Sequence, residues 1–152
     1  MNEEDIKGEL TGKFPSLADK VRVQRARRIF IDVEYAKLRP VLEFAGQKLG
    51  FLHLSAITGL DEGTNLAAIY HLSSDDGVML NVKTTVPKDD LRLQTVTGLY
   101  TCAEIYEREL VDLLGFKVEG LTLANRYPLT DDWPTDQFPL RKDWKKEVAK
   151  NG

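Results

Sequence analysis

Three strand-like runs stand in the middle of the chain and are separated by two short clusters of turn-forming residues. The runs cover residues 51–60, 66–72 and 78–86, and residues 61–64 and 73–77 between them are rich in Asp, Ser and Gly. These residue types favour tight turns, and strands joined by short turns pair antiparallel. The pattern predicts an antiparallel meander, so the chain has to fold around a sheet.

Two segments with helical spacing flank this meander. Apolar residues recur three or four positions apart in each segment: Leu38, Val41, Leu42, Ala45 and Leu49 in the first, and Cys102, Ile105, Tyr106, Leu110 and Leu113 in the second. Gly50 and Gly115 follow, and glycine favours the left-handed conformation that ends a helix. Pro40 is tolerable in a first turn. We expect helices on both sides of the meander, the second over 100–114.

The N-terminal part adds a short helix and a hairpin. Ile6, Leu10 and Phe14 are four residues apart, which predicts a helix over 3–14. Residues 21–23 and 29–33 alternate in polarity, which predicts two half-buried strands. The whole pattern predicts an α+β fold, a two-layer sandwich of a mixed or mostly antiparallel sheet with helices on one face.

The end of the chain differs from the rest. Residues 121–152 show no sustained period but contain three prolines and two tryptophans. Long segments without structure of their own are usually functional or disordered, and the aromatic residues argue against a plain solvated tail. We therefore expect a core domain over 1–120 and an extended docking segment over 121–152, called the C-terminal arm below.

Composition excludes several classes of function. The chain of 152 residues has a net charge of −3 and a sequence pI of about 5.5, which argues against nucleic acid as a partner. No apolar run approaches the roughly 20 residues that cross a bilayer, and the N-terminus is acidic rather than signal-like. We expect a chain that stays in the cytosol unless a partner holds it elsewhere.

Motifs for metals and nucleotides are weak. Cys102 is the one cysteine, and its place on an apolar stripe is typical of core filling. His53 and His71 lie in neighbouring predicted strands, but a shift of one residue in the pairing moves them to opposite faces. Gly115 and Gly120 imitate a phosphate-binding loop, except that Leu121 occupies the lysine position. We expect no metal site, no cofactor and no catalytic residue in this chain.

The second helix carries a cluster of charges. Glu104, Arg108 and Asp112 are spaced four apart and predict an ion-pair ladder on an exposed face. Glu109 shares the stripe of Ile105, Tyr106 and Leu113, so we expect its carboxylate to be drawn toward the core or an interface.

The C-terminal arm combines charges with aromatic residues at Asp131-Asp132-Trp133 and again from Pro139 to Trp144. Arg and Trp are enriched at the centres of protein interfaces. The alternative is that the arm docks on its own domain, with Arg141 bound to a helix carboxylate such as Glu109 and Trp133 packed on the core.

The same residues carry a resemblance to a known family. They are Tyr106, Glu107, Arg108, Glu109, Asp112 and Gly115, then Asp132 and Trp133, then Pro139, Leu140, Arg141, Lys142 and Asp143. In this order they resemble the signature of the small peripheral-arm subunit of NADH–quinone oxidoreductase (respiratory complex I), the one known as its C subunit. Residues 120–128 lack the Gly-His-Pro of respiratory members, and the related subunit of membrane-bound energy-converting nickel–iron hydrogenases also varies there.

The resemblance implies a non-catalytic structural subunit of the peripheral arm of a proton-pumping complex. Such a subunit packs on the hydrogenase-like large subunit near the quinone cavity, at the cytoplasmic face of the membrane. Flavin, iron–sulfur clusters and quinone would belong to partner subunits. Our hypothesis is that Arg141 and Asp143 make charge-assisted contacts with the large subunit, while Arg108 and Glu109 orient the C-terminal arm. Two alternatives remain: a free-standing enzyme that uses His53, His71 or Glu109, and a generic interaction module.

Overall fold

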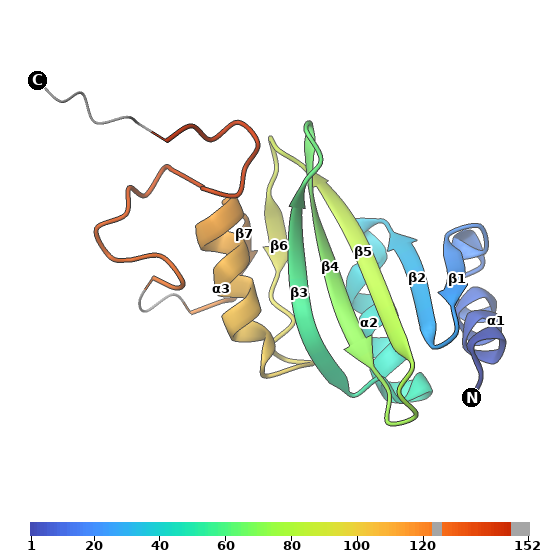
Figure 1. Cartoon of the computed structure of the whole chain (residues 1–152). Helices are drawn as coiled ribbons and strands as arrows, with labels where there is room; N and C mark the ends of the chain where they lie inside the picture. The colour runs from blue at the N-terminus through green and yellow to red at the C-terminus, as the bar shows by residue number, and fades with distance from the viewer. Residues whose placement is uncertain (123–125, 147–152) are drawn as a thin grey trace, which may run out of the picture.

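A computed structural model describes residues 1–122 and 126–146 (Figure 1). The elements, in chain order, are α1 (Glu3–Lys13), the 3-10 helix η1 (Pro15–Leu17), β1 (Val21–Arg25), β2 (Arg28–Val33), α2 (Tyr35–Leu49), β3 (His53–Asp61), β4 (Asn65–Ser73), β5 (Met79–Pro87), β6 (Arg92–Gln94), α3 (Ala103–Leu114) and β7 (Lys117–Glu119). Within the described ranges, no helix has the length and apolar character needed to cross a membrane.

The main sheet has five strands in the order β1-β2-β5-β4-β3. The predicted meander is confirmed, because β3, β4 and β5 pair antiparallel in sequence. The predicted hairpin of β1 and β2 is also confirmed. Since α2 carries the chain from β2 to the far edge at β3, the meander returns toward β2, and β5 pairs with it in parallel. The sheet is therefore mixed, as the α+β prediction allows.

A second, smaller sheet consists of β6 and β7, which pair in parallel with α3 between them in sequence. Figure 1 shows α3 beside this pair, beyond the β3 edge of the main sheet. The sequence analysis predicts no strand at the position of β6. A strand of three residues is too short to show a period.

The helices share one hydrophobic core. Side chains of α1, α2 and α3 join a single buried cluster with those of the main sheet, including Leu10, Leu42 and Leu110. At the β3 edge, α3 approaches closely because Gly59 has no side chain. A Cβ atom there would lie 2.8 Å from Cδ2 of Leu110 and closer still to Leu114.

Three local predictions need correction. Helix α2 begins at Tyr35, so Pro40 lies in its second turn rather than its first. Helix α3 begins at Ala103 rather than at residue 100, and Cys102 is its N-cap. The Cys102 side chain is exposed and does not fill the core, because the helix turns a different face toward the sheet than the apolar stripe suggested.

Candidate functional site

Several of the family-like residues meet around α3, and one of them, Glu107, is buried. Glu107 is 1% exposed, and its carboxylate accepts hydrogen bonds from the Thr95 hydroxyl at 2.6 Å and from the Val96 N–H at 2.7 Å. Burial raises the pKa of Glu107, although these two hydrogen bonds oppose the shift. Of the two places expected for the Glu109 carboxylate, the core is therefore wrong, because Glu107 occupies it and Glu109 is only partly buried; the interface stays a prediction.

Asp112 lies beneath the C-terminal arm. Its carboxylate accepts a hydrogen bond from the Leu129 N–H at 3.2 Å and is 3.7 Å from Nε of Arg126. Arg126 in turn donates to the carbonyl of Trp133. The predicted ladder on an exposed face is wrong at this end, because Asp112 is 8% exposed and bonds to the arm.

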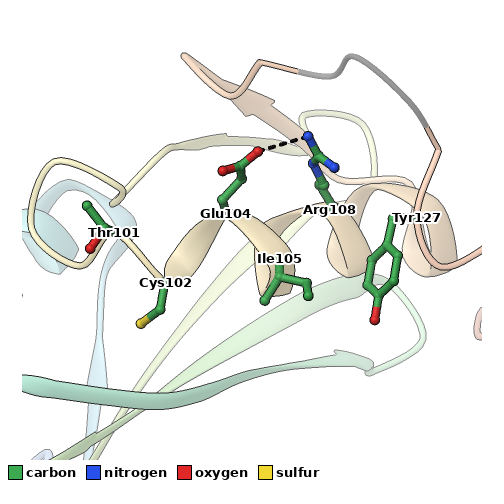
Figure 2. Close-up of a pocket in the computed structure, with 6 residues that line it drawn as sticks. All are labelled: Thr101, Cys102, Glu104, Ile105, Arg108 and Tyr127. Carbon is green, nitrogen blue, oxygen red and sulfur yellow. Dashed lines mark hydrogen bonds and ion pairs between the residues drawn. The ribbon is translucent and has the colours of Figure 1, made fainter.

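The other end of the predicted ladder is confirmed. Arg108 pairs with Glu104 at 2.8 Å, as Figure 2 shows. These two residues line an open pocket of about 360 Å³ together with Thr101, Cys102, Ile105 and Tyr127. Tyr127 reaches this pocket from the arm, so α3 and the arm form it together.

At the C-terminal end of α3, Gly115 ends the helix with a φ of 80°. Arg141 packs against this glycine, donates from Nε to the Leu114 carbonyl at 2.6 Å, and lies over the Phe138 ring at 4.7 Å from its centre. The Leu140 N–H donates to the Leu113 carbonyl at 3.0 Å. The predicted contact of Arg141 with Glu109 is therefore wrong, because the guanidinium binds a helix-end carbonyl instead.

Asp61, at the end of β3, binds the backbone of Lys142, the residue of the arm that follows Arg141. Its carboxylate accepts hydrogen bonds from the N–H groups of Lys142 at 2.8 Å and Gly63 at 2.9 Å, and lies 3.0 Å from the Lys88 ammonium. Burial alone would raise the pKa of Asp61, but these donors outweigh it and lower the pKa to about 2. Sequence analysis gave Asp61 no role beyond a turn, although an Asp two residues before Gly is a signal for such a side-chain cap.

The remaining arm residues bond mainly among themselves. The indole N–H groups of Trp133 and Trp144 donate to the carbonyl and the side chain of Gln137, at 2.9 and 3.3 Å, and the two rings lie 5.9 Å apart. Asp132 accepts a hydrogen bond from Thr130. Trp133 is not part of the core cluster, so it does not close the core. Pro139 is partly buried, whereas the side chains of Lys142, Asp143 and Asp131 are exposed.

The two histidines do not meet. His53 lies 3.2 Å from Asp75, while His71 bonds through Nε2 to Thr58 at 2.8 Å and through Nδ1 to Asn81 at 2.6 Å. Over residues 1–122 and 126–146, no three His, Cys, Asp or Glu side chains gather in a way that suits a metal ion. The hydrogen bonds of Asp112, Arg141 and Asp61 described above attach the C-terminal arm to α3 and to the end of β3.

Comparison with known proteins agrees with this interpretation of the motif. The family model described as "Respiratory-chain NADH dehydrogenase, 30 Kd subunit" matches residues 31–149. The C subunit of the F(420)H(2) dehydrogenase of Methanosarcina mazei is 33% identical over 147 residues, which cover 95% of this chain and 92% of the relative. The chain belongs to this family. The resemblance drawn from the signature is confirmed.

Members of related complexes are also similar to the chain. Hydrogenase-4 component G of Escherichia coli is 32% identical, and the match covers 92% of this chain but 26% of that longer protein. A solved structure of the membrane-bound sulfane sulfur reductase, an archaeal respiratory membrane complex, contains a chain that superposes with a TM-score of 0.84 at 30% identity. That match covers 93% of this chain and 85% of the other. The chain is thus similar to subunits of respiratory and of hydrogenase complexes.

Proposed function

We propose that this chain is a non-catalytic structural subunit in the peripheral arm of a proton-pumping NADH:quinone oxidoreductase of the complex I type. In this proposal it packs on the hydrogenase-like large subunit near the quinone cavity, at the cytoplasmic face of the membrane. Flavin, iron–sulfur clusters and quinone belong to the partner subunits, and the isolated chain has no turnover.

One observation carries the proposal beyond the family match. Among the family-like residues, Glu107, Asp112 and Arg141 form hydrogen bonds within this chain itself, and Gly115 leaves room for Arg141. Asp112, Gly115 and Arg141 hold the C-terminal arm on α3 and so build a surface from two distant parts of the sequence, while Glu107 holds α3 on residues 95–96. A set of residues used in this way suits a docking subunit better than an enzyme, whose acid–base groups have to reach a substrate.

A second candidate is the equivalent small subunit of an energy-converting membrane-bound nickel–iron hydrogenase. The similarity to hydrogenase-4 component G favours it, as does the absence of Gly-His-Pro from residues 120–128. Both candidates assign this chain the same docking role and differ in the chemistry of its partners.

The test is to tag this chain in its native host, solubilise the membranes gently and identify the copurifying chains by mass spectrometry. A set containing flavin, iron–sulfur clusters and a quinone-cavity large subunit supports the complex I proposal. A large subunit that binds nickel supports the hydrogenase candidate. Recovery of the chain alone from the soluble fraction would contradict both.

A further inference from the structure

A groove runs between β3 and α3 on the surface of the molecule. Its volume is about 290 Å³, and its lining comes from three parts of the chain: Thr58 and Gly59 in β3, Tyr106, Glu109 and Leu113 in α3, and Leu140 in the C-terminal arm. Most of the lining is apolar. Gly59 lets α3 approach β3 closely, and the arm adds the side chain of Leu140 to the lining.

Leu140 is exposed but well positioned. Its side chain is 57% exposed, which is unusual for a leucine whose backbone is fixed on both sides. The Leu140 N–H bonds to the Leu113 carbonyl, and the next two residues are held by Leu114 and Asp61. An apolar side chain held rigidly toward solvent at a groove is typical of a binding surface.

Glu109 gives the groove its charge. Glu107 and Asp112 of the same helix both accept hydrogen bonds, and Glu104 pairs with Arg108. In contrast, among the residues that the structure describes, Glu109 has neither an ion pair nor a side-chain hydrogen bond. A partly buried carboxylate beside apolar surface gains most from a cation that becomes buried with it.

We propose that this groove receives a segment of a partner subunit that presents an Arg or Lys side chain to Glu109 and an apolar side chain to the wall formed by Tyr106 and Leu140. The inference rests on the proposed function and deepens it, because it names the chemistry of the partner surface. The basic side chain of the partner is inferred from the charge of Glu109, and its apolar side chain is inferred from the apolar lining of the groove. The C-terminal arm contributes Leu140, so the groove is complete only when the arm is docked.

The first test replaces Glu109→Gln in the tagged chain within the native complex. Glutamine keeps the size and polarity of the side chain but removes the charge. The matched control is Glu104→Gln, which removes an acid from the same helix outside the groove. We expect Glu109→Gln to leave at least about tenfold less partner bound after a salt wash, as loss of a buried charge pair does, while Glu104→Gln retains it. Equal retention by the two variants overturns the proposal.

The second test places the photo-reactive amino acid p-benzoylphenylalanine at position 140 and identifies the crosslinked peptides. The expected product joins position 140 to a partner peptide with an Arg or Lys close to the crosslinked residue. A crosslink confined to this chain, or to a partner peptide without a basic residue, overturns the inference. If the unmodified tagged chain copurifies with an oxidoreductase and these results are negative, the groove assignment fails while the proposed function stands.

Discussion

Gly115→Ala is the substitution that tests most directly whether the C-terminal arm depends on α3. Gly115 has a φ of 80°, and a Cβ atom there would lie 2.6 Å from Nη2 of Arg141 and 2.8 Å from the Phe138 ring. Alanine therefore meets two obstacles, the left-handed backbone and the arm itself. Gly50→Ala is the matched control, since Gly50 also ends a helix, has a φ of 76° and has open space where a Cβ would lie.

The two costs can be separated by comparing these variants. A left-handed conformation costs an L-residue about 1–2 kcal/mol, and both variants carry this cost. Displacement of the arm removes the bond from the Arg141 guanidinium to the Leu114 carbonyl, about 1.5–3 kcal/mol, because a charged donor is involved. The stacking of Arg141 on Phe138 adds about 0.5–1 kcal/mol. Since a released arm regains conformational entropy, the free energy of unfolding should fall by about 2 kcal/mol more in Gly115→Ala than in Gly50→Ala.

Urea denaturation of both variants measures this difference, and amide hydrogen exchange locates it. The N–H groups of Leu140 and Lys142 bond to Leu113 and Asp61, so both should lose protection in Gly115→Ala and keep it in Gly50→Ala. Equal losses of stability, together with unchanged protection at Leu140, would refute the dependence of the arm on this glycine.

Three further predictions concern single side chains. Hydrogen bonds hold the pKa of Asp61 near 2, below its ordinary value of 3.8, so its stabilising effect should be complete above about pH 4. In urea denaturation, the stability advantage of the wild type over Asp61→Asn should therefore shrink as the pH falls toward 2. Burial raises the pKa of Glu107 above its ordinary value of 4.5, so folding favours its protonated form and the wild type loses stability as the pH rises from 4.5. The unfolding free energy of Glu107→Gln relative to the wild type should therefore increase over this range, and a difference in unfolding free energy that does not change with pH would contradict the shift. Gly59→Val introduces a side chain where Leu110 and Leu114 pack, so it should destabilise the fold by about 1–3 kcal/mol and lower the melting temperature in calorimetry. Gly98→Val is the control and should not show this loss, because a Cβ atom there would lie 3.9 Å from Nη2 of Arg39.

Local signals in the sequence were sufficient for most of the fold. The turn residues around 61–64 and 73–77 separate strands that pair with their immediate neighbours, so short-range chemistry determines the meander. Gly50 and Gly115 both adopt the left-handed conformation that their positions predicted. These elements were predictable because each depends on contacts within a few residues.

The environment of the α3 acids was not predictable in the same way. Glu107 is buried because Thr95 and Val96 offer it two donors, and Asp112 is buried because residues 126–129 lie over it. The periodicity of α3 does not show that residues 95–96 and 126–129 pack over these two acids. Asp61 was missed for the same reason, since its partner Lys142 lies 81 residues away along the chain. Polar groups that bind across such distances follow tertiary geometry, which composition and spacing do not encode.

The spacing of the three acids explains why one short motif can serve three surfaces. At 3.6 residues per turn, Glu109 lies about 200° and Asp112 about 140° around the helix from Glu107. A helix on a two-layer sandwich buries one side only, yet here Glu107 faces residues 95–96 and the core, Asp112 faces the C-terminal arm, and Glu109 faces the groove. The stability of the free chain should therefore respond to substitution of Glu107 or Asp112 and be insensitive to Glu109→Gln, because the partner of Glu109 is present only in the complex. A large loss of stability in free Glu109→Gln would show instead that this carboxylate stabilises the fold of the free chain. That result would contradict the proposal that a basic side chain of a partner binds Glu109 in the groove.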